Sequence, residues 1–296
     1  MGGIFIYLLD FFQKVIRKSN ASIIIYLAIN VLVIVGIFSN GFSSWQGIFI
    51  GVLAYIVSLA LALSPIGEAI LRWQLGAKPI QREDHLSRLM PLFNEVYARA
   101  NEMDSNLPKD IKLYINKDMN RNAFATGRKT ICLTRGILDS SDEEIKGVLA
   151  HEFGHLSNKD TDLILLITIG NLFTTAFFLI YRWTFLLIGY FVGIFYRSWT
   201  ALIMTFFIDV ILVALMSLWT KLGIMLVMHS SRKNEFEADY FAHKLGYGLP
   251  LIEVLNSFGD DIPYRKGIFA TLVASHPDPD ERIAKIQTLE GKPHAY

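Results

Sequence analysis

The sequence predicts a mainly α-helical membrane protein, with about four transmembrane helices and a cytoplasmic α+β domain that contains a small antiparallel sheet. Hydrophobic residues make up 52% of the 296 residues and charged residues only 19%. The mean hydropathy of +0.38 exceeds that of ordinary soluble domains. The apolar residues gather in long uncharged runs, which alternate with charged stretches of soluble composition. These observations together predict membrane helices and a separate aqueous domain.

The first membrane segment is predicted to be a hairpin. Ser22–Phe38 and Trp45–Leu63 are uncharged runs separated by the polar turn Asn40–Ser44, and each run can cross a bilayer as a helix. The apolar stretch Gly2–Lys18 contains charges and is short, which favours an interfacial helix. Basic residues lie on both sides of the hairpin and none lies between its spans: Lys14, Arg17, Lys18, Arg72, Lys78 and Arg82. By the positive-inside rule, both ends of the hairpin are expected in the cytoplasm.

Two further spans are predicted at Leu163–Tyr181 and Trp199–Trp219, whereas the run Trp183–Phe195 is short for a span. Asp209 lies in the middle of the last run. A charge exposed to lipid there costs about 3 kcal/mol or more. We therefore expect Asp209 to make a polar contact between helices, with Asn171 as a candidate partner.

The charged stretches predict a domain made of two pieces. In the first piece, a helical pattern at Leu92–Met103 precedes strand-like runs that turn residues separate: Ile111–Ile115, Asn122–Thr126 and Thr130–Thr134. Ser141 and Glu144 then form a capping box, and apolar residues recur behind it at helical spacing. In the second piece, Glu235–Leu245 and Asp278–Gln287 are predicted helices.

The capped helix contains the sequence His-Glu-Phe-Gly-His. His151 and His155 are four residues apart, so their imidazoles project from one helix face about 6 Å apart and can share one metal ion. A carboxylate beside zinc-bound water, here Glu152, can accept the water's proton during peptide hydrolysis. The motif therefore predicts a zincin-like domain that binds one Zn²⁺ per chain, with Glu152 as a catalytic residue. The alternative is an exposed helix face that carries this pattern by chance.

A catalytic zinc needs a third protein ligand. Several residues of the second piece are candidates: His229, Glu235, Glu237, Asp239 and His243. Glu235 and Asp239 lie on one helical face, so one can bind metal while the other accepts a hydrogen bond from a ligand imidazole. An ordinary exposed helix face is the alternative for this pair. Glu235 can reach His151 only if the chain between them crosses the membrane an even number of times, and two spans satisfy this condition.

Four motifs resemble the HtpX family of membrane zinc metalloproteases, which is related to the type I CAAX prenyl proteases. In chain order they are NAFATG, HEFGH, NEFEAD and SHPDPDERI. The resemblance implies that Glu235 is the third zinc ligand and that Asp239 supports the site. It also implies a zinc metalloendopeptidase of the cell membrane that acts on membrane or unfolded proteins in stress response and protein quality control.

The resemblance implies further roles. An edge strand beside the metal helix is expected to bind an extended substrate through its backbone, and it comprises Asn122, Ala123, Phe124 and Ala125. A turn residue is the alternative for Asn122. His276 corresponds to a position that helps to stabilise the oxyanion on the scissile carbonyl. Arg282 is expected to be a structural partner of the site carboxylates.

The remaining expectations concern partners and organisation. A net charge of +1 gives no general attraction for nucleic acid, and the single cysteine, Cys132, fits a core position in a reducing compartment. The expected partners are the lipid bilayer and protein substrates. The expected segments are a membrane segment at 1–82, catalytic pieces at 83–162 and 229–296, and a second membrane hairpin at 163–228. A prenyl-protein protease and a non-catalytic zinc scaffold or chaperone stay open as alternatives, although a scaffold would have no use for Glu152.

Overall fold

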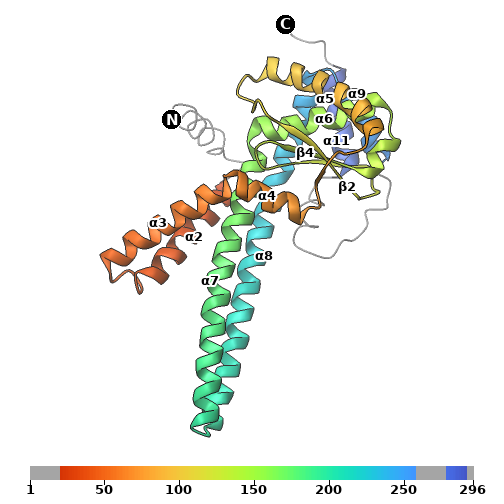
Figure 1. Ribbon diagram of the computed structural model, residues 1–296. Coiled ribbons are helices and arrows are strands. Elements are labelled where there is room, and N and C mark those ends of the chain that lie inside the picture. Colours follow the sequence, from red (N-terminus) through yellow and green to blue (C-terminus); the bar gives the residue numbers. More distant parts are fainter. Residues whose placement is uncertain (1–20, 258–277, 292–296) are drawn as a thin grey trace.

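The chain divides into membrane-type helices and a compact domain that contains the sheet (Figure 1). The computed structural model describes residues 21–257 and 278–291, and within helices the side chains of residues 22–23, 163–164, 166–174, 220 and 224–232 lie outside the description. The predicted interfacial helix Gly2–Lys18 and the predicted oxyanion residue His276 also lie outside the described residues. The fold is mostly helical with a small sheet, as the composition predicts.

Four long helices form the membrane-type part, namely α2 (Ala21–Phe38), α3 (Trp45–Ala62), α7 (Asp160–Phe195) and α8 (Trp199–Lys244). Three segments among the described residues are long and apolar enough to cross a membrane: Trp45–Ala62, Thr175–Phe195 and Trp199–Gly223. Ile24–Phe38 is a shorter apolar helix. The first hairpin and the last span therefore lie where the sequence predicts them, with α2 covering the predicted run Ser22–Phe38.

The third predicted span lies in a longer helix than the two runs suggest. Leu163–Tyr181 and Trp183–Phe195 belong to one continuous helix, α7, and Thr175–Phe195 is the apolar segment among those of its residues whose side chains are described. Arg182 lies inside this segment, which made the two runs look separate. The charge is tolerated because Arg182 makes a bidentate ion pair with Asp209 on α8, at 2.5 Å from Nε to Oδ1 and 2.9 Å from Nη2 to Oδ2. Asp209 thus makes the predicted polar contact between helices, and its partner is Arg182.

The sheet has four strands in the order β1-β2-β4-β3, formed by β1 (Lys78–Pro79), β2 (Lys112–Asn116), β3 (Ala123–Thr126) and β4 (Thr130–Thr134). β4 pairs parallel to β2 and antiparallel to β3. The prediction of a purely antiparallel sheet is therefore wrong. The loop after β2 carries the chain past the position of β4, and the turn at Gly127 (φ +62°) reverses it. This path makes β4 a fully buried internal strand and leaves β3 at an edge.

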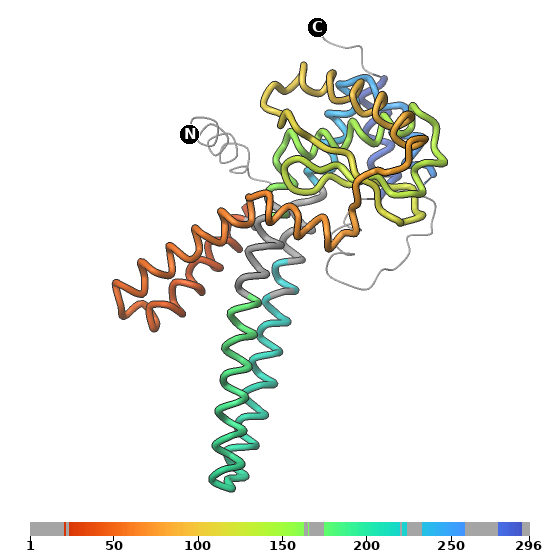
Figure 2. The backbone as a smooth tube through the Cα atoms, in the orientation of Figure 1, coloured from red at the N-terminus to blue at the C-terminus, as the bar shows by residue number. Residues whose placement is uncertain are grey.

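Helices from both ends of the chain pack into one core around the sheet. They are α5 (Glu83–Met103), α6 (Asp142–Asn158), the last turns of α8, α9 (Gly248–Ser257) and α11 (Pro279–Glu290). Figure 2 shows the green α6 segment beside the blue C-terminal segments. The predicted capping box of α6 is confirmed. The predicted separate helix Glu235–Leu245 is instead the continuation of α8, which ends before Gly246 (φ +86°).

A short helix, α4 (Pro65–Gln74), joins the first hairpin to the sheet. Its Glu68 is 5% exposed, and the Glu68 carboxylate accepts hydrogen bonds from Thr130 Oγ1 at 2.5 Å and from the Lys129 backbone N–H at 3.2 Å. Arg72 lies 3.1 Å from the same carboxylate. Because a Cβ atom at Gly127 would lie 2.6 Å from the Glu68 side chain, only glycine fits this turn. The β3–β4 turn is therefore fixed to α4.

Cys132 is expected to be chemically inert in the folded protein. It is fully buried in β4, and burial raises the pKa of its thiol to about 12. Since the thiolate is the reactive form, only about one thiol in ten thousand is ionised at pH 8. A charged thiol reagent should leave Cys132 unmodified at pH 8 and modify it after unfolding, as measured by mass spectrometry. Rapid modification of protein with unchanged circular dichroism would contradict this assignment.

Candidate metal centre

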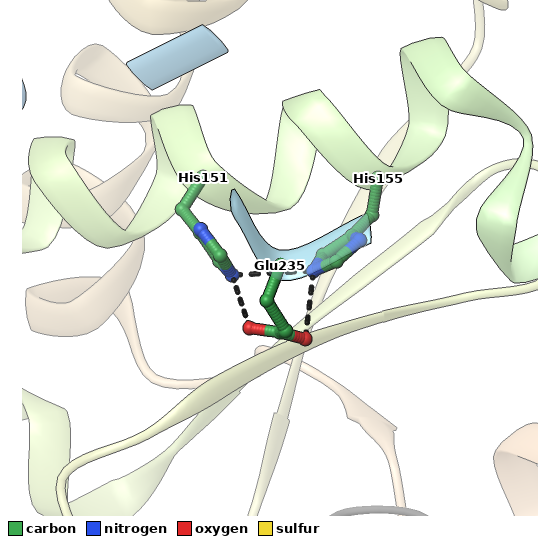
Figure 3. A group of neighbouring side chains, drawn as sticks. All are labelled: His151, His155 and Glu235. Atoms are coloured by element: carbon green, nitrogen blue, oxygen red, sulfur yellow. Dashed lines mark hydrogen bonds and ion pairs between the residues drawn. The ribbon is translucent and has the colours of Figure 1, made fainter. Parts of the chain in front are cut away.

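His151 and His155 lie on α6 with their Nε2 atoms 3.2 Å apart. Glu235 reaches them from α8: its Oε2 lies 3.4 Å from His151 Nε2, and its Oε1 lies 3.3 Å from His155 Nε2 (Figure 3). His151 and Glu235 are buried, and one ligand atom from each of the three residues lies within 4.8 Å of the others. Residues separated by the whole α7–α8 hairpin therefore converge on one point.

The close approach of α6 and α8 depends on a glycine inside the histidine motif. A Cβ atom at Gly154 would lie 2.8 Å from the Cα atom and 3.1 Å from the Cβ atom of Ala238. Both positions carry the smallest available side chains, so the two helix backbones can approach until Glu235 faces the imidazoles. The fourth residue of His-Glu-Phe-Gly-His thus has a packing role in this chain.

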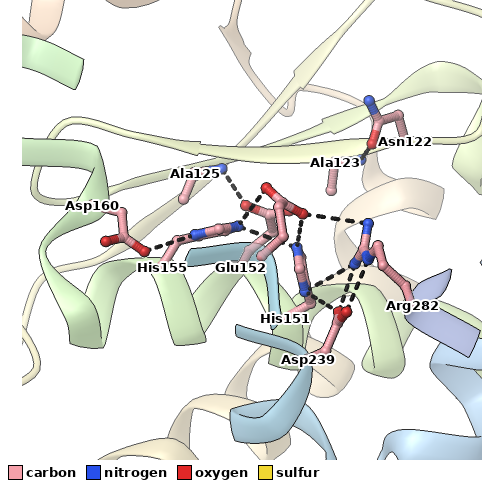
Figure 4. Close-up of polar contacts among 10 residues, drawn as sticks. Asn122, Ala123, Ala125, His151, Glu152, His155, Asp160, Asp239 and Arg282 are labelled. Carbon is pink, nitrogen blue, oxygen red and sulfur yellow. Dashed lines mark hydrogen bonds and ion pairs between the residues drawn. The ribbon is translucent and has the colours of Figure 1, made fainter. Parts of the chain in front are cut away.

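Each imidazole is held by a carboxylate on its Nδ1 side (Figure 4). His151 Nδ1 lies 2.9 Å from Asp239 Oδ1, and His155 Nδ1 lies 3.1 Å from Asp160 Oδ2. An Nδ1–H donated to a carboxylate leaves the Nε2 lone pair directed at the centre, which is the tautomer that a metal ion binds. The structure therefore presents both Nε2 atoms as ligand atoms.

Arg282 from α11 balances the negative charge around the centre. Its guanidinium binds Asp239 in a bidentate pair at 2.8 and 2.6 Å, and its Nη1 lies 3.3 Å from Glu235 Oε2. Burial raises the pKa of Asp239, but Arg282 and His151 outweigh burial and lower that pKa to about 2. Asp239 is therefore ionised across the physiological range, and the predicted contact of Arg282 with site carboxylates is present.

Burial lowers the pKa of His155, but the carboxylates of Glu235 and Asp160 outweigh burial and raise that pKa well above its ordinary value. The His151 pKa is also raised, because Asp239 and Glu235 outweigh burial and the repulsion by Arg282. This excess of negative charge at the imidazoles favours a cation. A divalent metal ion binds neutral imidazole and would replace the proton.

The donor set and its spacing fit zinc. Two imidazole nitrogens and one carboxylate oxygen are a donor set of catalytic zinc sites. With zinc–ligand bonds of about 2.0 to 2.1 Å, ligand atoms of a tetrahedral ion lie about 3.3 Å from one another. The two Nε2 atoms lie 3.2 Å apart, His151 Nε2 lies 3.4 Å from Glu235 Oε2, and His155 Nε2 lies 3.3 Å from Glu235 Oε1. Each of these distances is close to that spacing, and one ligand atom from each residue lies within 4.8 Å of the others. The three residues therefore fit the donor set of one zinc ion.

Glu152 lies at the side of the centre that faces β3. Its Oε2 accepts a hydrogen bond of 2.5 Å from the Ala125 backbone N–H. Asn122 precedes β3, and its Oδ1 accepts from the Ala123 backbone N–H at 2.9 Å. The Thr134 N–H donates to the Asn122 carbonyl at 2.9 Å. In an antiparallel pair the bonded positions alternate, so the backbone groups of Ala123 and Ala125 point away from β4, toward the edge of the sheet where no other described strand pairs with β3.

The other residues considered as third ligand lie elsewhere. His243 Nδ1 pairs with Glu290 at 2.7 Å, and Glu237 lies 3.6 Å from Lys233. The side chain of His229 lies outside the described residues. Sequence reasoning missed Asp160, although a signal was present: His155 also needs an Nδ1 acceptor, and Asp160 follows a chain reversal at Lys159 (φ +64°). This left-handed residue directs Asp160 back toward the imidazole.

The partner carboxylate of His155 should affect metal affinity. Asp160→Asn keeps the size of the side chain but removes the charge that orients the imidazole. We expect the zinc dissociation constant to rise about 10- to 100-fold, as measured by competition with a chromophoric chelator. Asp142→Asn, which alters an exposed carboxylate of α6, is the control and should leave it unchanged. Equal affinities for the two variants would show that Asp160 does not support the centre.

Comparison with known proteins agrees with this geometry. The description "Peptidase family M48" matches residues 89–290, more than half of the chain. A protease HtpX homologue from Lactobacillus acidophilus is 32% identical over 173 residues, which cover 54% of this chain and 53% of that protein. Another from Pseudarthrobacter chlorophenolicus is 28% identical over 240 residues, covering 71% and 75%. The chain thus spans about half the length of the first relative and more of the second.

One further curated protein and one solved structure are also similar to this chain. A CAAX prenyl protease 1 homologue from Caenorhabditis elegans is 32% identical over 157 residues, covering 51% of this chain and 34% of that protein. The crystal structure of S. mikatae Ste24p aligns with a TM-score of 0.45 at 20% identity, covering 86% of this chain and 61% of that chain. The predicted resemblance to HtpX-type proteases is confirmed, and this chain belongs to peptidase family M48.

Proposed function

We propose that this chain is a zinc metalloendopeptidase embedded in the cell membrane, with His151, His155 and Glu235 as zinc ligands. The observation that carries the proposal is the convergence of two imidazole nitrogens and one carboxylate, whose ligand atoms lie within 4.8 Å of one another. Family membership supports the peptidase activity, and the long apolar helices support the location in a membrane. The basic residues around the first hairpin support a cytoplasmic position of the centre.

In the proposed reaction, Glu152 is the general base. Zinc, when bound, lowers the pKa of water and polarises the scissile carbonyl. The Glu152 carboxylate accepts the proton of the attacking water and later gives it to the leaving amine. Asp239 and Asp160 hold the two imidazoles at their Nδ1 atoms, while Arg282 holds the Asp239 carboxylate. His276 is proposed to stabilise the oxyanion, on the basis of the family resemblance.

The substrate is proposed to bind along β3 as an added strand. The Ala123 and Ala125 N–H groups point to the free edge, and side chains of Asn122 and Glu152 accept from them. An extended substrate would replace these side chains with its own carbonyl groups. Binding would then free the Glu152 carboxylate beside the scissile bond. Recognition through the backbone depends little on side chains, which suits unfolded segments of membrane or misfolded proteins. Phe124 lies between the two outward N–H groups and is the remaining residue of the proposed binding strand.

The assignment of Glu152 can be tested without disturbing the metal ligands. Glu152→Gln should reduce cleavage of an unfolded membrane protein at least about a hundredfold, while the purified protein retains one zinc ion per chain. Glu143→Gln alters an exposed carboxylate of the same helix and should retain full cleavage.

Unchanged cleavage by the Glu152 variant would refute the proposed function. Loss of zinc from that variant would instead assign Glu152 to the metal site. In the same assay, prenylated and unprenylated peptides offered together separate a general endopeptidase from a prenyl-protein protease. We expect no preference for the prenylated peptide.

The edge strand can be tested by removing one backbone donor. Ala125→Pro eliminates the outward N–H, and proline is tolerated at an edge position whose N–H faces away from the sheet. Loss of one hydrogen bond should raise the KM of a protein substrate about tenfold. Ala125→Ser retains the N–H and should have the wild-type KM. A proline variant with normal folding, judged by its thermal unfolding, and with an unchanged KM would exclude substrate binding at Ala125.

A further inference from the structure

Helix α4 has two different faces. Gly67, Glu68 and Leu71 are buried against the rest of the protein, where Glu68 binds the β3–β4 turn. On the opposite face, Ile66 is 61% exposed and Trp73 is 80% exposed. Together with neighbouring side chains they line a shallow apolar hollow of about 440 Å³, formed by Pro65, Ile66, Ala69, Ile70 and Trp73. This apolar face is unusual for a helix that contacts water.

The position of α4 places this face at the end of a membrane span. The candidate span Trp45–Ala62 ends two residues before Ser64, and the Ser64 hydroxyl accepts from the backbone N–H groups of Ile66 and Gly67. This cap starts a new helix instead of prolonging α3. In Figure 1, α4 runs across the direction of α7 and α8, between the sheet and the membrane-type helices. A helix in this position meets the boundary of a bilayer.

The chemistry of the face favours lipid over a protein partner. Tryptophan is enriched at membrane interfaces, and amphipathic helices that lie in the interface bury a similar apolar face between headgroups and acyl chains. The face continues directly from α3, whose exposed apolar side chains already require lipid. A specific protein interface buries about 800 Å² per partner, which is more area than five side chains of a ten-residue helix supply.

We propose that α4 lies in the plane of the membrane interface, with Ile66, Ala69, Ile70 and Trp73 inserted between the lipid headgroups and the first acyl-chain carbons. The bound partner is the bilayer itself. Because Glu68 on the other face holds the β3–β4 turn, the lipid surface fixes the height of the edge strand above the membrane. This inference concerns membrane contact and does not depend on the proposed peptidase activity.

Spin labels can locate the apolar face of α4 relative to lipid. Cys132→Ala provides a background without thiols, into which Ala69→Cys and Trp73→Cys are introduced one at a time. Ile203→Cys, on an exposed position of the α8 span, serves as the lipid reference. Glu102→Cys, at an exposed position of α5, serves as the water reference. Each full-length protein is labelled with a nitroxide and reconstituted in nanodiscs of phosphatidylcholine and phosphatidylglycerol.

The measurement compares relaxation of each label by oxygen, which concentrates in lipid, with relaxation by a water-soluble nickel chelate. The labels at positions 69 and 73 should give oxygen-to-nickel ratios between those of the lipid and water references. A ratio equal to the water reference would overturn the proposal. Protection from both reagents would also overturn it, because a second copy or another segment of the chain would then cover this face. A circular dichroism spectrum and a thermal unfolding midpoint equal to those of the wild-type protein, measured for every variant, verify that the domain is folded.

Discussion

The structure depends on the contact between the Glu235 carboxylate and the two imidazoles of α6. This contact joins α6 to the last third of α8, and α7 and the first part of α8 lie between the contacting residues in the sequence. The contact requires α6 and α8 to lie very close together at Gly154. Any larger residue there would place its Cβ atom against the backbone of Ala238 on α8. A single buried charge is unfavourable, and here Arg282 pairs with the buried carboxylates of Asp239 and Glu235. The candidate metal centre therefore joins the two pieces of the domain, in addition to the hydrophobic core that they share.

The helices have a structural role beyond spanning. α7 and α8 are continuous from the membrane-type segment into the domain, so Asp160 at one end of α7 and Glu235 near the end of α8 approach the centre as parts of rigid helices. The Arg182–Asp209 ion pair joins the same helices inside the apolar segment. In a low dielectric, a slip of one helix against the other would separate this pair at considerable cost. The pair therefore resists sliding of Glu235 relative to α6.

The local features of the sequence correspond closely to the structure. The capping box at Ser141 starts α6, and Asp278 starts α11 at the predicted residue. The sequence was less informative about which strands pair and about where one helix continues into the next apolar run. Strand pairing is a long-range choice, so the parallel pairing of β2 with β4 was not predictable from three short runs. The extent of α7 was misjudged because neutralisation of Arg182 by Asp209 involves a residue on another helix.

The sequence by itself determined the metal motif, because the spacing of two histidines on one helix is a property of a single element. It also determined that Glu235 and Asp239 share one helix face. An even number of membrane crossings between His155 and Glu235 places both residues on the same side of the membrane. Only the tertiary structure decided which nitrogen each partner contacts, that Asp160 supports His155, and that the outward N–H groups of β3 lie beside Glu152. These properties arise where separate elements meet, and helical periodicity carries no information about distances between elements.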